Sequence, residues 1–478
     1  MDHFNFKQGE LFCEDVPIKN IAEKFGTPAY VYSKATLIRH LNVYQKSLEG
    51  LNGIVCFSVK ALSNLSILKL LDEHGSGFDI VSGGELHRCI KAGIDPKKII
   101  FSGVGKSADE IALALKVGIL SFNVESESEL KRIYQISKNM NLMAPIGLRV
   151  NPDVDAGGHE YIKTGKKENK FGISFEKALD IAKEYSNKPE LNFLAITCHI
   201  GSQILDLKSF KNAAEQMLDL ANRLDQIGLE IKIIDMGGGL GVRYIDEETS
   251  APAELMEIYQ DVFSGTNKRI FLEPGRSIAA NAGILLAKVE YLKNNFLITD
   301  TAMNDLLRPA LYKANHQVVP LLEQNISHNK VDVVGPVCES GDYLAKEAEL
   351  AIKENEFLAS MLAWERAPVL PIRAWFEPAL SMPRPDDFSM DLEGADKLHQ
   401  VLWETIYRLF EKRIVLEFTD HLSDRELYQV IFRDILPSEE KKMEDSESYL
   451  HWDCADATRN PEIYLSYYAS EQERVEWE

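Results

Sequence analysis

Eight short apolar runs recur through residues 53–273, and nearly every run ends in polar or glycine residues suited to chemistry. They read GIVCFSVK, GFDIVSGGE, IIFSGVGK, LSFNVES, MAPIGLRVN, FLAITCHIGSQ, IKIIDMGGGLG and RIFLEPGR. Amphipathic stretches with apolar residues at helical spacing separate the runs, for example residues 107–116 and 209–227. Alternating buried strands and helices predict a parallel sheet, and eight repeats are the number that closes a barrel. The expected fold is therefore α/β, built on a (β/α)8 TIM barrel.

The ends of these runs also predict where catalysis would take place. In TIM barrels the active site lies at the carboxyl ends of the strands. The residues that fall at those ends are Lys60, Asp79, Ser82, His199, Gly237, Gly238, Gly239 and Glu273. We therefore expect one rim of the barrel to carry the site.

Composition limits the partners of the chain. Its 478 residues carry a net charge of −21, which argues against a nucleic-acid or anionic-membrane surface. No apolar run approaches the roughly 18 residues that span a bilayer, and residues 1–10 lack a signal-peptide pattern, so a cytoplasmic location is expected. The six cysteines lack CxxC pairs or regular spacing, which is typical of reduced thiols. No metal site is predicted.

The chain changes character after residue 361. All five tryptophans lie in residues 362–478, which hold 13 lysine and arginine residues against 26 acidic ones. A proline-rich passage at 367–387 cannot form a continuous helix. Helices are predicted at 394–412 and 423–436, with a strand at 413–418 between them. Residues 362–478 are therefore expected to form a small acidic α/β module, to which the sequence assigns no function.

Each polar residue at the rim has two interpretations, a structural role and a role in catalysis or cofactor binding. Lys60 is either a solvent-facing strand-end lysine or a Schiff-base lysine whose amine is deprotonated by its site. The glycine run 237–241 is either a tight turn or a phosphate site made of backbone N–H groups. Glu273 needs a partner in its apolar run, either Arg276 or a pyridinium nitrogen. His199 is either a core histidine bonded to backbone or a ring that stacks on a flat cofactor.

The catalytic interpretations of these residues together indicate a single cofactor. An aldehyde would be trapped by Lys60, a phosphate held by the glycine loops, and a ring nitrogen paired with Glu273. Together these features predict pyridoxal 5′-phosphate. Asp79 and Ser82, at the end of the second run, are expected to contact the same cofactor.

The motifs closely resemble those of the diaminopimelate decarboxylases, pyridoxal-phosphate enzymes of fold type III with an alanine-racemase-like barrel. The matching segments are FSVKALSN, GSGFDIVSGGEL, FSGVGKS, FNVES, RVNPDV, HEYIKTGKKENKFGI, HIGSQ, DMGGGLG, EPGRSI, LRPALY and GPVCESGDYLA. They extend almost continuously from about residue 5 to about residue 360. The resemblance implies decarboxylation of meso-2,6-diaminopimelate to L-lysine and carbon dioxide, the last step of lysine biosynthesis.

The resemblance also implies a role for each site residue. Lys60 would bind the cofactor aldehyde, His199 would stack on the ring, and Glu273 would pair with its nitrogen. The phosphate would be bound by Gly238, Gly239 and Gly275 with Ser202 nearby, and the substrate carboxylate by Arg276, Arg308 and Tyr312. Cys338 and Glu339 would enter the active site of a partner subunit in a homodimer, Cys338 for protonation and Glu339 for the distal amino group.

The resemblance ends after residue 361. The family continues with a segment of the type AGAYGF…NYN and with further strands, whereas this chain reads LAWERAPVLPIRAWFEPAL. The tyrosine that contacts the cofactor phosphate in the family is absent at that position, which is expected to weaken cofactor binding by about 1–3 kcal/mol. The missing strands would expose an edge of the sheet.

The sequence thus predicts a barrel at 36–280, a β-rich domain from 1–35 and 281–361 that is truncated relative to the family, and the module 362–478. Two alternatives stay open for the function. One is a related decarboxylase that acts on ornithine, arginine or carboxynorspermidine. The other is a catalytically impaired fusion that acts as a binding or regulatory protein.

Overall fold

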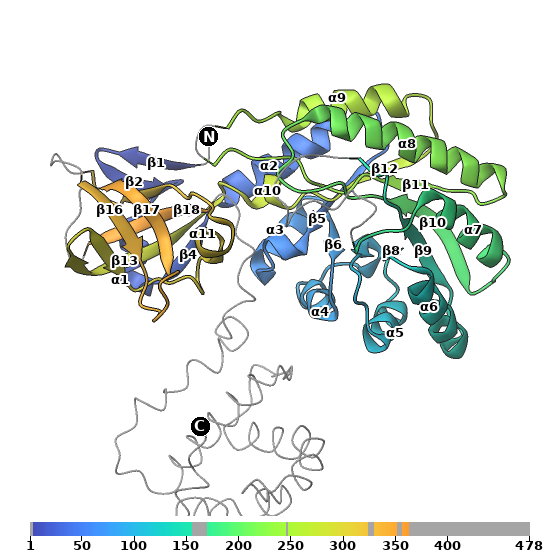
Figure 1. Cartoon of the computed structure of the whole chain (residues 1–478), viewed down its shortest axis with the longest axis horizontal. Helices are drawn as coiled ribbons and strands as arrows, with labels where there is room; N and C mark the ends of the chain where they lie inside the picture. Colours follow the sequence, from blue (N-terminus) through green and yellow to red (C-terminus); the bar gives the residue numbers. More distant parts are fainter. Residues whose placement is uncertain (1–2, 155–169, 245–246, 324–328, 351–355, 363–478) are drawn as a thin grey trace, which may run out of the picture. The chain divides into compact units, whose positions relative to one another are not determined.

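The computed structural model describes residues 3–154, 170–244, 247–323, 329–350 and 356–362. Eight parallel strands in them close a barrel in the order β10-β11-β12-β5-β6-β7-β8-β9 (Figure 1). The barrel strands are β5 (Ile54–Ser58), β6 (Gly77–Ile80), β7 (Ile99–Phe101), β8 (Ser121–Val124), β9 (Ala144–Arg149), β10 (Leu191–Thr197), β11 (Ile233–Asp235) and β12 (Arg269–Leu272). Seven strands lie within one of the eight apolar runs and β10 begins two residues before its run, so the predicted barrel is confirmed.

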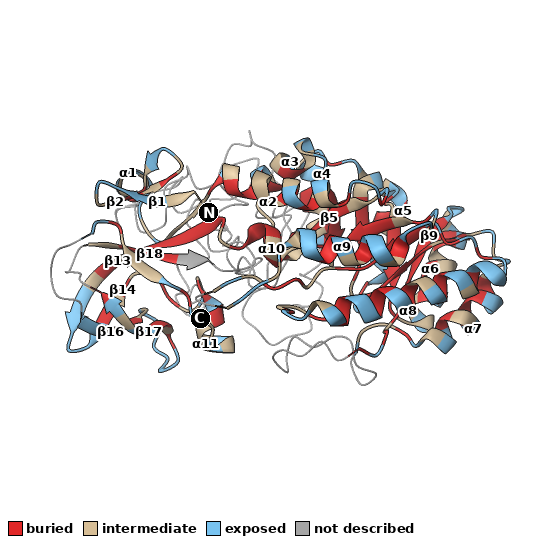
Figure 2. Ribbon diagram, turned by 90° about the horizontal axis from the view of Figure 1, so that it is seen from above, coloured by how far each residue is buried: buried red, intermediate tan, exposed pale blue. Residues whose placement is uncertain are grey.

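Helices follow the strands and cover the outside of the barrel (Figure 1). They are α2 (Lys34–Ser47), α3 (Leu65–Glu73), α4 (Gly83–Lys91), α5 (Ala108–Val117), α6 (Glu127–Met140), α7 (Phe175–Tyr185), α8 (Leu207–Gln226), α9 (Pro252–Phe263) and α10 (Arg276–Ala279). Short 3-10 turns lie at η1 (Val59–Ala61) and η2 (Pro96–Lys98). In Figure 2 the strands are buried and the outer helix faces are exposed, as amphipathic helices on a buried sheet require.

Local sequence signals set the limits of these helices. Ser107 begins α5 by accepting the N–H of Glu110, whose carboxylate accepts the N–H of Ser107 in return. Gly118 ends the helix with φ 78°, a left-handed conformation that glycine adopts without steric cost. The predicted helix at 107–116 is therefore confirmed to within one residue.

The barrel is filled by side chains, so it is a packed core and not a channel. Cys56, Ile100, Ala195, Ile233 and Phe271 form one buried cluster contributed by five strands. A larger cluster lies between strands and helices. Cys56 and Cys198 are both buried in these clusters as small apolar residues. The rim is thus built on a rigid support.

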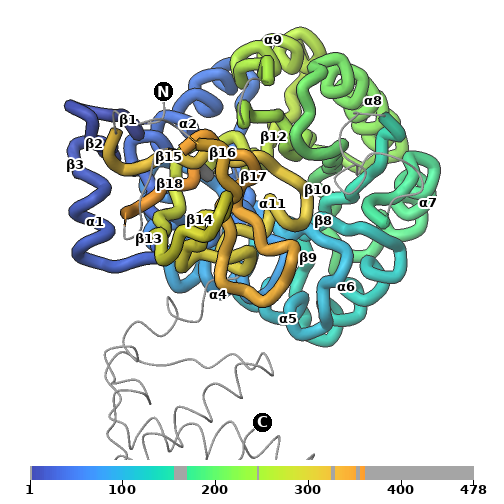
Figure 3. Tube along the Cα trace, turned by 60° about the vertical axis from the view of Figure 1, so that its left-hand side comes forward, coloured from blue at the N-terminus to red at the C-terminus, as the bar shows by residue number. Residues whose placement is uncertain are grey.

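A second, mixed sheet has the order β15-β18-β13-β14-β16-β17, with β4 paired to β13. Its elements are β4 (Ala29–Tyr32), β13 (Gly283–Lys293), β14 (Phe296–Thr299), α11 (Leu307–Tyr312), β15 (Val318–Pro320), β16 (Asn329–Val334), β17 (Tyr343–Leu350) and β18 (Phe357–Leu362). Figure 3 shows the N-terminal elements of the chain beside strands β13, β15 and β18, as the β4–β13 pairing requires.

A small sheet of β1 (Phe4–Lys7), β2 (Glu10–Cys13) and β3 (Val16–Pro17), followed by α1 (Ile18–Phe25), adds to this region. The N–H of Leu11 bonds the carbonyl of Leu321 at 2.9 Å, which ties the start of the chain to the late strands. Strands from both ends of the matching region thus form the β-rich part. The boundaries 1–35, 36–280 and 281–361 stay a prediction.

Two predicted features lie outside the described residues: the module 362–478, except for Leu362 at the end of β18, and most of the HEYIKTGKKENKFGI segment. Among the helices that the structure describes, none has the length and apolar character needed to cross a bilayer.

Candidate active site

Lys60 and Asp79 form an ion pair where the first two barrel strands end. Lys60 lies in η1, directly after β5, and its Nζ is 3.4 Å from Oδ2 of Asp79. Ser58 donates its hydroxyl to the same oxygen at 2.9 Å and so fixes the carboxylate. The Asp79 side chain is fully buried, whereas that of Lys60 is 34% exposed. The lysine is therefore held in place but remains accessible.

Burial and nearby carboxylates shift the pKa of Lys60 in opposite directions. Burial alone would lower the pKa of Lys60, but the carboxylates of Asp79 and Glu273 outweigh it, so its pKa is raised. These contacts favour the protonated amine, and the role of Lys60 as a Schiff-base lysine stays a prediction. The apolar run before Lys60 could not reveal that carboxyl groups from other strands converge on it.

Glu273 lies directly after β12 and is only 7% exposed, as its apolar run predicts. Asn123, at β8, donates its amide to Oε1 of Glu273 at 3.3 Å. The Asp235 carboxyl, at the end of β11, lies within hydrogen-bonding reach of the Glu273 carboxyl. Burial, and after it the charges of Asp235 and Asp79, raise the pKa of Glu273 well above its ordinary range.

Arg276 belongs to a different part of the site. Its guanidinium donates to the Ser202 hydroxyl at 3.0 Å and to the Tyr244 hydroxyl. Glu273 contacts Asn123 and Asp235, so the structure supports separate roles for Glu273 and Arg276 and not an internal salt bridge. Burial lowers the pKa of Arg276 to about 10, which leaves it cationic at neutral pH.

A second arginine lies in the same cluster. The Arg308 guanidinium, from α11, lies 5.7 Å from the ring centre of Tyr244 and 4.9 Å from that of Tyr312. The His316 ring meets Tyr244 edge-on at 5.9 Å. Two buried guanidinium groups beside tyrosine rings form a site suited to an anion such as a carboxylate.

The glycine turn is required by the close approach of two strand ends. A Cβ at Gly238 would lie 2.3 Å from the carbonyl oxygen of Glu273, and Gly237 and Gly239 have φ of 65° and 112°. At Gly275, a Cβ would lie 3.0 Å from that of Ser58. Glycine is thus needed here for packing, and the N–H groups of Gly237 and Gly238 donate to Asp235 and His199.

His199 lies beside this turn, and its Nδ1 accepts the N–H of Gly238 at 3.2 Å. Burial, followed by the charges of Lys60 and Arg149, lowers the pKa of His199 well below its ordinary value. The imidazole is therefore neutral. His199 is thus a buried histidine bonded to backbone, as its structural interpretation predicts. The same hydrogen bond fixes the plane of the ring.

Among the residues that the structure describes, the remaining predicted ones make no side-chain hydrogen bond or ion pair with Lys60, Glu273 or Arg276. The Ser82 hydroxyl accepts the N–H of Glu85 at 3.2 Å and caps α4. Cys338 and Glu339 are exposed on the loop between β16 and β17. Asp342 shapes this loop, because its buried carboxylate accepts the N–H groups of Met303 at 2.6 Å and Val337 at 2.9 Å.

Sequence reasoning missed several residues of the site. Asn123 and Asp235 contact Glu273, Ser58 fixes Asp79, and Tyr244 contacts Arg276. Ser58 and Asp235 are the last residues of β5 and β11, Asn123 is the next-to-last residue of β8, and Tyr244 follows the glycine turn. The rule that selected Lys60 would therefore have found three of them.

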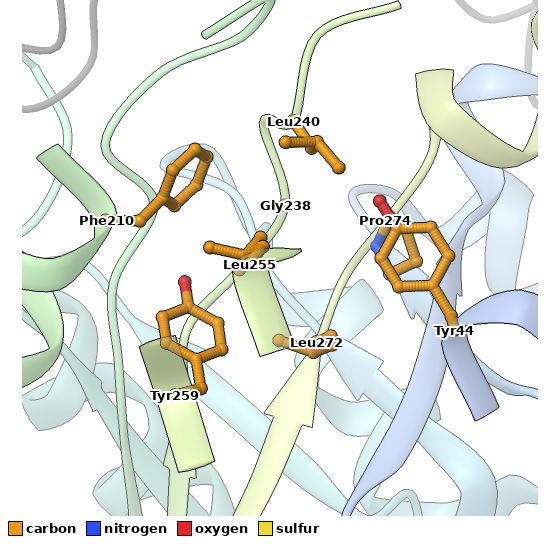
Figure 4. A pocket seen from close by; sticks show the side chains of 9 residues that line it. Tyr44, Phe210, Gly238, Leu240, Leu255, Tyr259, Leu272 and Pro274 are labelled. Carbon is orange, nitrogen blue, oxygen red and sulfur yellow. The ribbon is translucent and has the colours of Figure 1, made fainter. Parts of the chain in front are cut away.

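A small pocket lies behind the glycine turn (Figure 4). Its lining residues are Tyr44, Phe210, Gly237, Gly238, Leu240, Leu255, Tyr259, Leu272 and Pro274. None of them carries a charge at neutral pH, so this pocket is less suited to a charged amino acid than the rim.

The rim also contains a buried ion pair that holds the end of β9. The Glu125 carboxylate accepts from the Arg149 guanidinium and from the N–H of Gly172 at 2.8 Å, and the guanidinium lies 4.9 Å from the Phe171 ring centre.

Replacing Glu125 with alanine leaves a buried cation without its carboxylate, which is expected to lower the free energy of unfolding by about 3–5 kcal/mol. Urea titration measures this loss, with Glu215→Ala on the exposed face of α8 as the control. Equal unfolding midpoints for the two variants would contradict the prediction.

Comparison with known proteins matches this chain to pyridoxal-dependent decarboxylases, in agreement with the residues at the rim. Residues 34–280 match the family described as pyridoxal-dependent decarboxylase, pyridoxal binding domain. A diaminopimelate decarboxylase from Pseudomonas fluorescens is 48% identical over 364 residues, which cover 75% of this chain and 88% of the relative. One from Haemophilus influenzae is 47% identical over 370 residues, covering 76% and 89%.

Solved structures agree with this match. Diaminopimelate decarboxylase from Helicobacter pylori, complexed with L-lysine, has a TM-score of 0.72 at 39% identity and covers 74% of this chain and 91% of that chain. The M. jannaschii enzyme, in co-complex with L-lysine, has a TM-score of 0.72 at 33% identity, with 76% and 88% covered. A lysine decarboxylase from Selenomonas ruminantium, 20% identical with a TM-score of 0.67, shares the fold. About a quarter of this chain has no counterpart in these relatives, in agreement with the resemblance ending near residue 361.

Proposed function

This chain belongs to the diaminopimelate decarboxylases, a branch of the pyridoxal-dependent decarboxylases, and we propose that it converts meso-2,6-diaminopimelate into L-lysine and carbon dioxide. It is accordingly a pyridoxal-phosphate-dependent lyase. The observation that carries the proposal is the identity of 42–48% to diaminopimelate decarboxylases across nearly the whole length of those relatives. L-Lysine, the product of this reaction, is the ligand named for two of the structural neighbours.

The residues present fit pyridoxal 5′-phosphate. Asp79 and Glu273 lie near the amine of Lys60, and Asp235 lies beside Glu273. Oδ1 of Asp79 and Oδ2 of Asp235 are buried and have no hydrogen-bond donor among the described residues. An excess of buried acid favours a cationic ring at this place. When bound, the cofactor supplies an electron sink for the pair of electrons left by the departing carboxylate.

We assign the binding roles on this basis. Lys60 would hold the aldehyde carbon and Glu273 the ring nitrogen, while the neutral imidazole of His199 would lie against the ring. Gly238, Gly239 and Gly275 would line the phosphate site, where the lack of side chains lets a phosphate approach the backbone, with the Ser202 hydroxyl and the Arg276 guanidinium beside them. Asp79 orients the Lys60 amine through their ion pair. Ser82 is assigned to the cofactor shell through its position at the end of β6.

Arg276, Arg308 and Tyr312 would bind the carboxylate that the substrate retains. The buried pair of guanidinium groups supports this role, since charge-assisted bonds to a carboxylate are strong and directional. Tyr244, which contacts Arg276 and lies beneath Arg308, would keep the two cations apart.

Cys338 and Glu339 would act across a homodimer. Their exposure on the loop between β16 and β17 supports a place at a surface between two subunits. The Cys338 thiol would deliver a proton to the carbon that has lost its carboxylate, and Glu339 would bind the distal amino group of the substrate. A cytoplasmic location belongs to the same proposal, because the L-lysine formed is used there.

Release of carbon dioxide from a set of amino acids tests the proposal. The purified full chain with pyridoxal phosphate is expected to release carbon dioxide from meso-diaminopimelate faster than from ornithine, arginine or carboxynorspermidine. A preference for ornithine would instead assign the chain to the related decarboxylases. Release from none of the four would support the binding or regulatory alternative.

A further inference from the structure

Asp235 is a buried acid beside Glu273 for which the proposed reaction has no use. It ends β11, is 1% exposed, and its Oδ1 accepts the N–H of Gly237 at 2.9 Å. Its Oδ2 is buried and meets no hydrogen-bond donor among the described residues. The neighbour within reach is the Glu273 carboxyl, which is also an acceptor when ionised.

Two carboxyl groups in contact need a proton between them. When both are ionised, the contact is repulsive, and in a buried site water cannot screen it. When one is protonated, its O–H donates to the other, which satisfies the acceptor oxygen of Asp235. Asn123 is occupied elsewhere, since its amide donates to Ser102 at 3.0 Å and to Oε1 of Glu273 at 3.3 Å.

The charged groups around the pair favour the same state. Asp79 adds a third carboxylate from β6, and Lys60 and Arg149 are the cations nearby. Lys60 is paired with Asp79 and Arg149 with Glu125, so neither is dedicated to the pair. The other neighbours with titratable side chains, Cys56, Cys198 and Tyr259, are neutral at physiological pH, because burial raises the pKa of each.

We propose that Asp235 and Glu273 share one proton, and that Glu273 passes this proton to the ring nitrogen of the cofactor. In this step the O–H bond of Glu273 breaks and the lone pair of the ring nitrogen takes up the proton. Two carboxylates and one pyridinium replace one carboxylate, one carboxylic acid and one neutral ring, so the net charge is unchanged. Asp235 is therefore a positioning residue that stores a proton where the ring requires it. This second step rests on the proposed function, whereas the shared proton does not.

Infrared difference spectroscopy on the full chain tests the proposal. The cofactor-free wild-type chain is expected to show the C=O stretch of a buried carboxylic acid at neutral pH, and addition of pyridoxal phosphate is expected to remove it. Asp235→Asn is expected to abolish the band, because the amide donates to Glu273 and keeps that carboxylate ionised. Glu273→Gln removes the other member of the pair and is expected to abolish the same band. Asp219→Asn, which changes a carboxylate 67% exposed on α8, is the matched control and keeps it.

The pH dependence of cofactor uptake gives a second readout. In Asp235→Asn the ring must draw its proton from solvent, so the dissociation constant above the pKa of the ring is expected to rise about tenfold per pH unit. The wild-type constant is expected to stay flat until the shared proton titrates. A wild-type chain without the acid band, or a variant with the wild-type pH profile, would overturn the inference. If the chain takes up no pyridoxal phosphate, the proposed function fails, while the band in the cofactor-free chain still decides whether the proton is shared.

Discussion

Lys60→Ala is expected to abolish the visible absorbance of lysine-bound pyridoxal phosphate and to lower carbon dioxide release by on the order of 10³-fold or more. Lys60 is the amine at the rim that lies against buried acids, with Nζ 3.4 Å from Asp79 and its side chain one-third exposed. No neighbouring side chain described at the rim provides a second amine at that position. The measurement is an absorption spectrum of the purified chain with added cofactor, followed by an assay with meso-diaminopimelate.

Two further variants separate chemistry from folding. Lys60→Arg keeps a cation beside Asp79, so it is expected to fold like the wild type and still lack the band. Lys69→Ala, on the exposed side of α3, is expected to keep both the band and the activity. A band that survives in Lys60→Ala would show that another amine holds the cofactor.

Gly238→Ala is expected to damage both stability and cofactor binding. The new Cβ would lie 2.3 Å from the Glu273 carbonyl oxygen, so the glycine turn or the end of β12 must move. Such overpacking costs about 1–3 kcal/mol of unfolding free energy, and occasionally more. The same shift would displace Glu273 and the Gly238 N–H that His199 accepts, so the dissociation constant for pyridoxal phosphate is expected to rise about tenfold or more.

Gly105 provides the matched control for this substitution. A Cβ at Gly105 meets nothing within 4 Å, and its backbone lies outside the left-handed region. Gly105→Ala is therefore expected to leave both the urea midpoint and cofactor affinity unchanged. If Gly238→Ala binds pyridoxal phosphate as Gly105→Ala does, the glycine turn is not part of the cofactor site.

The sequence predicted the barrel because its signal is local and repeated. Each run of the GIVCFSVK type is largely apolar, as a strand buried on both faces requires, and the intervening helices carry their own caps such as Ser107. The same logic brought Lys60, Asp79, Gly238 and Glu273 to one rim, since the carboxyl ends of parallel strands share one edge.

The electrostatics of the rim could not be predicted in the same way. The pKa of Lys60 depends on Asp79 and Glu273, which lie on two other strands, and the state of Glu273 depends on Asp235. These are contacts across the barrel, and the order of apolar and polar residues along one strand carries no information about them. The structural and the catalytic interpretation of Lys60 therefore differ in its pKa, which depends on contacts that form only in the assembled barrel.

The most direct test of the central claim is a spectrum of the purified full chain with pyridoxal phosphate, recorded before and after addition of meso-diaminopimelate. We expect a visible band that depends on Lys60, a change in that band when the substrate is added, and L-lysine and carbon dioxide in equal amounts. A chain that takes up no pyridoxal phosphate, or that holds it but leaves meso-diaminopimelate unchanged, would not be a diaminopimelate decarboxylase in function.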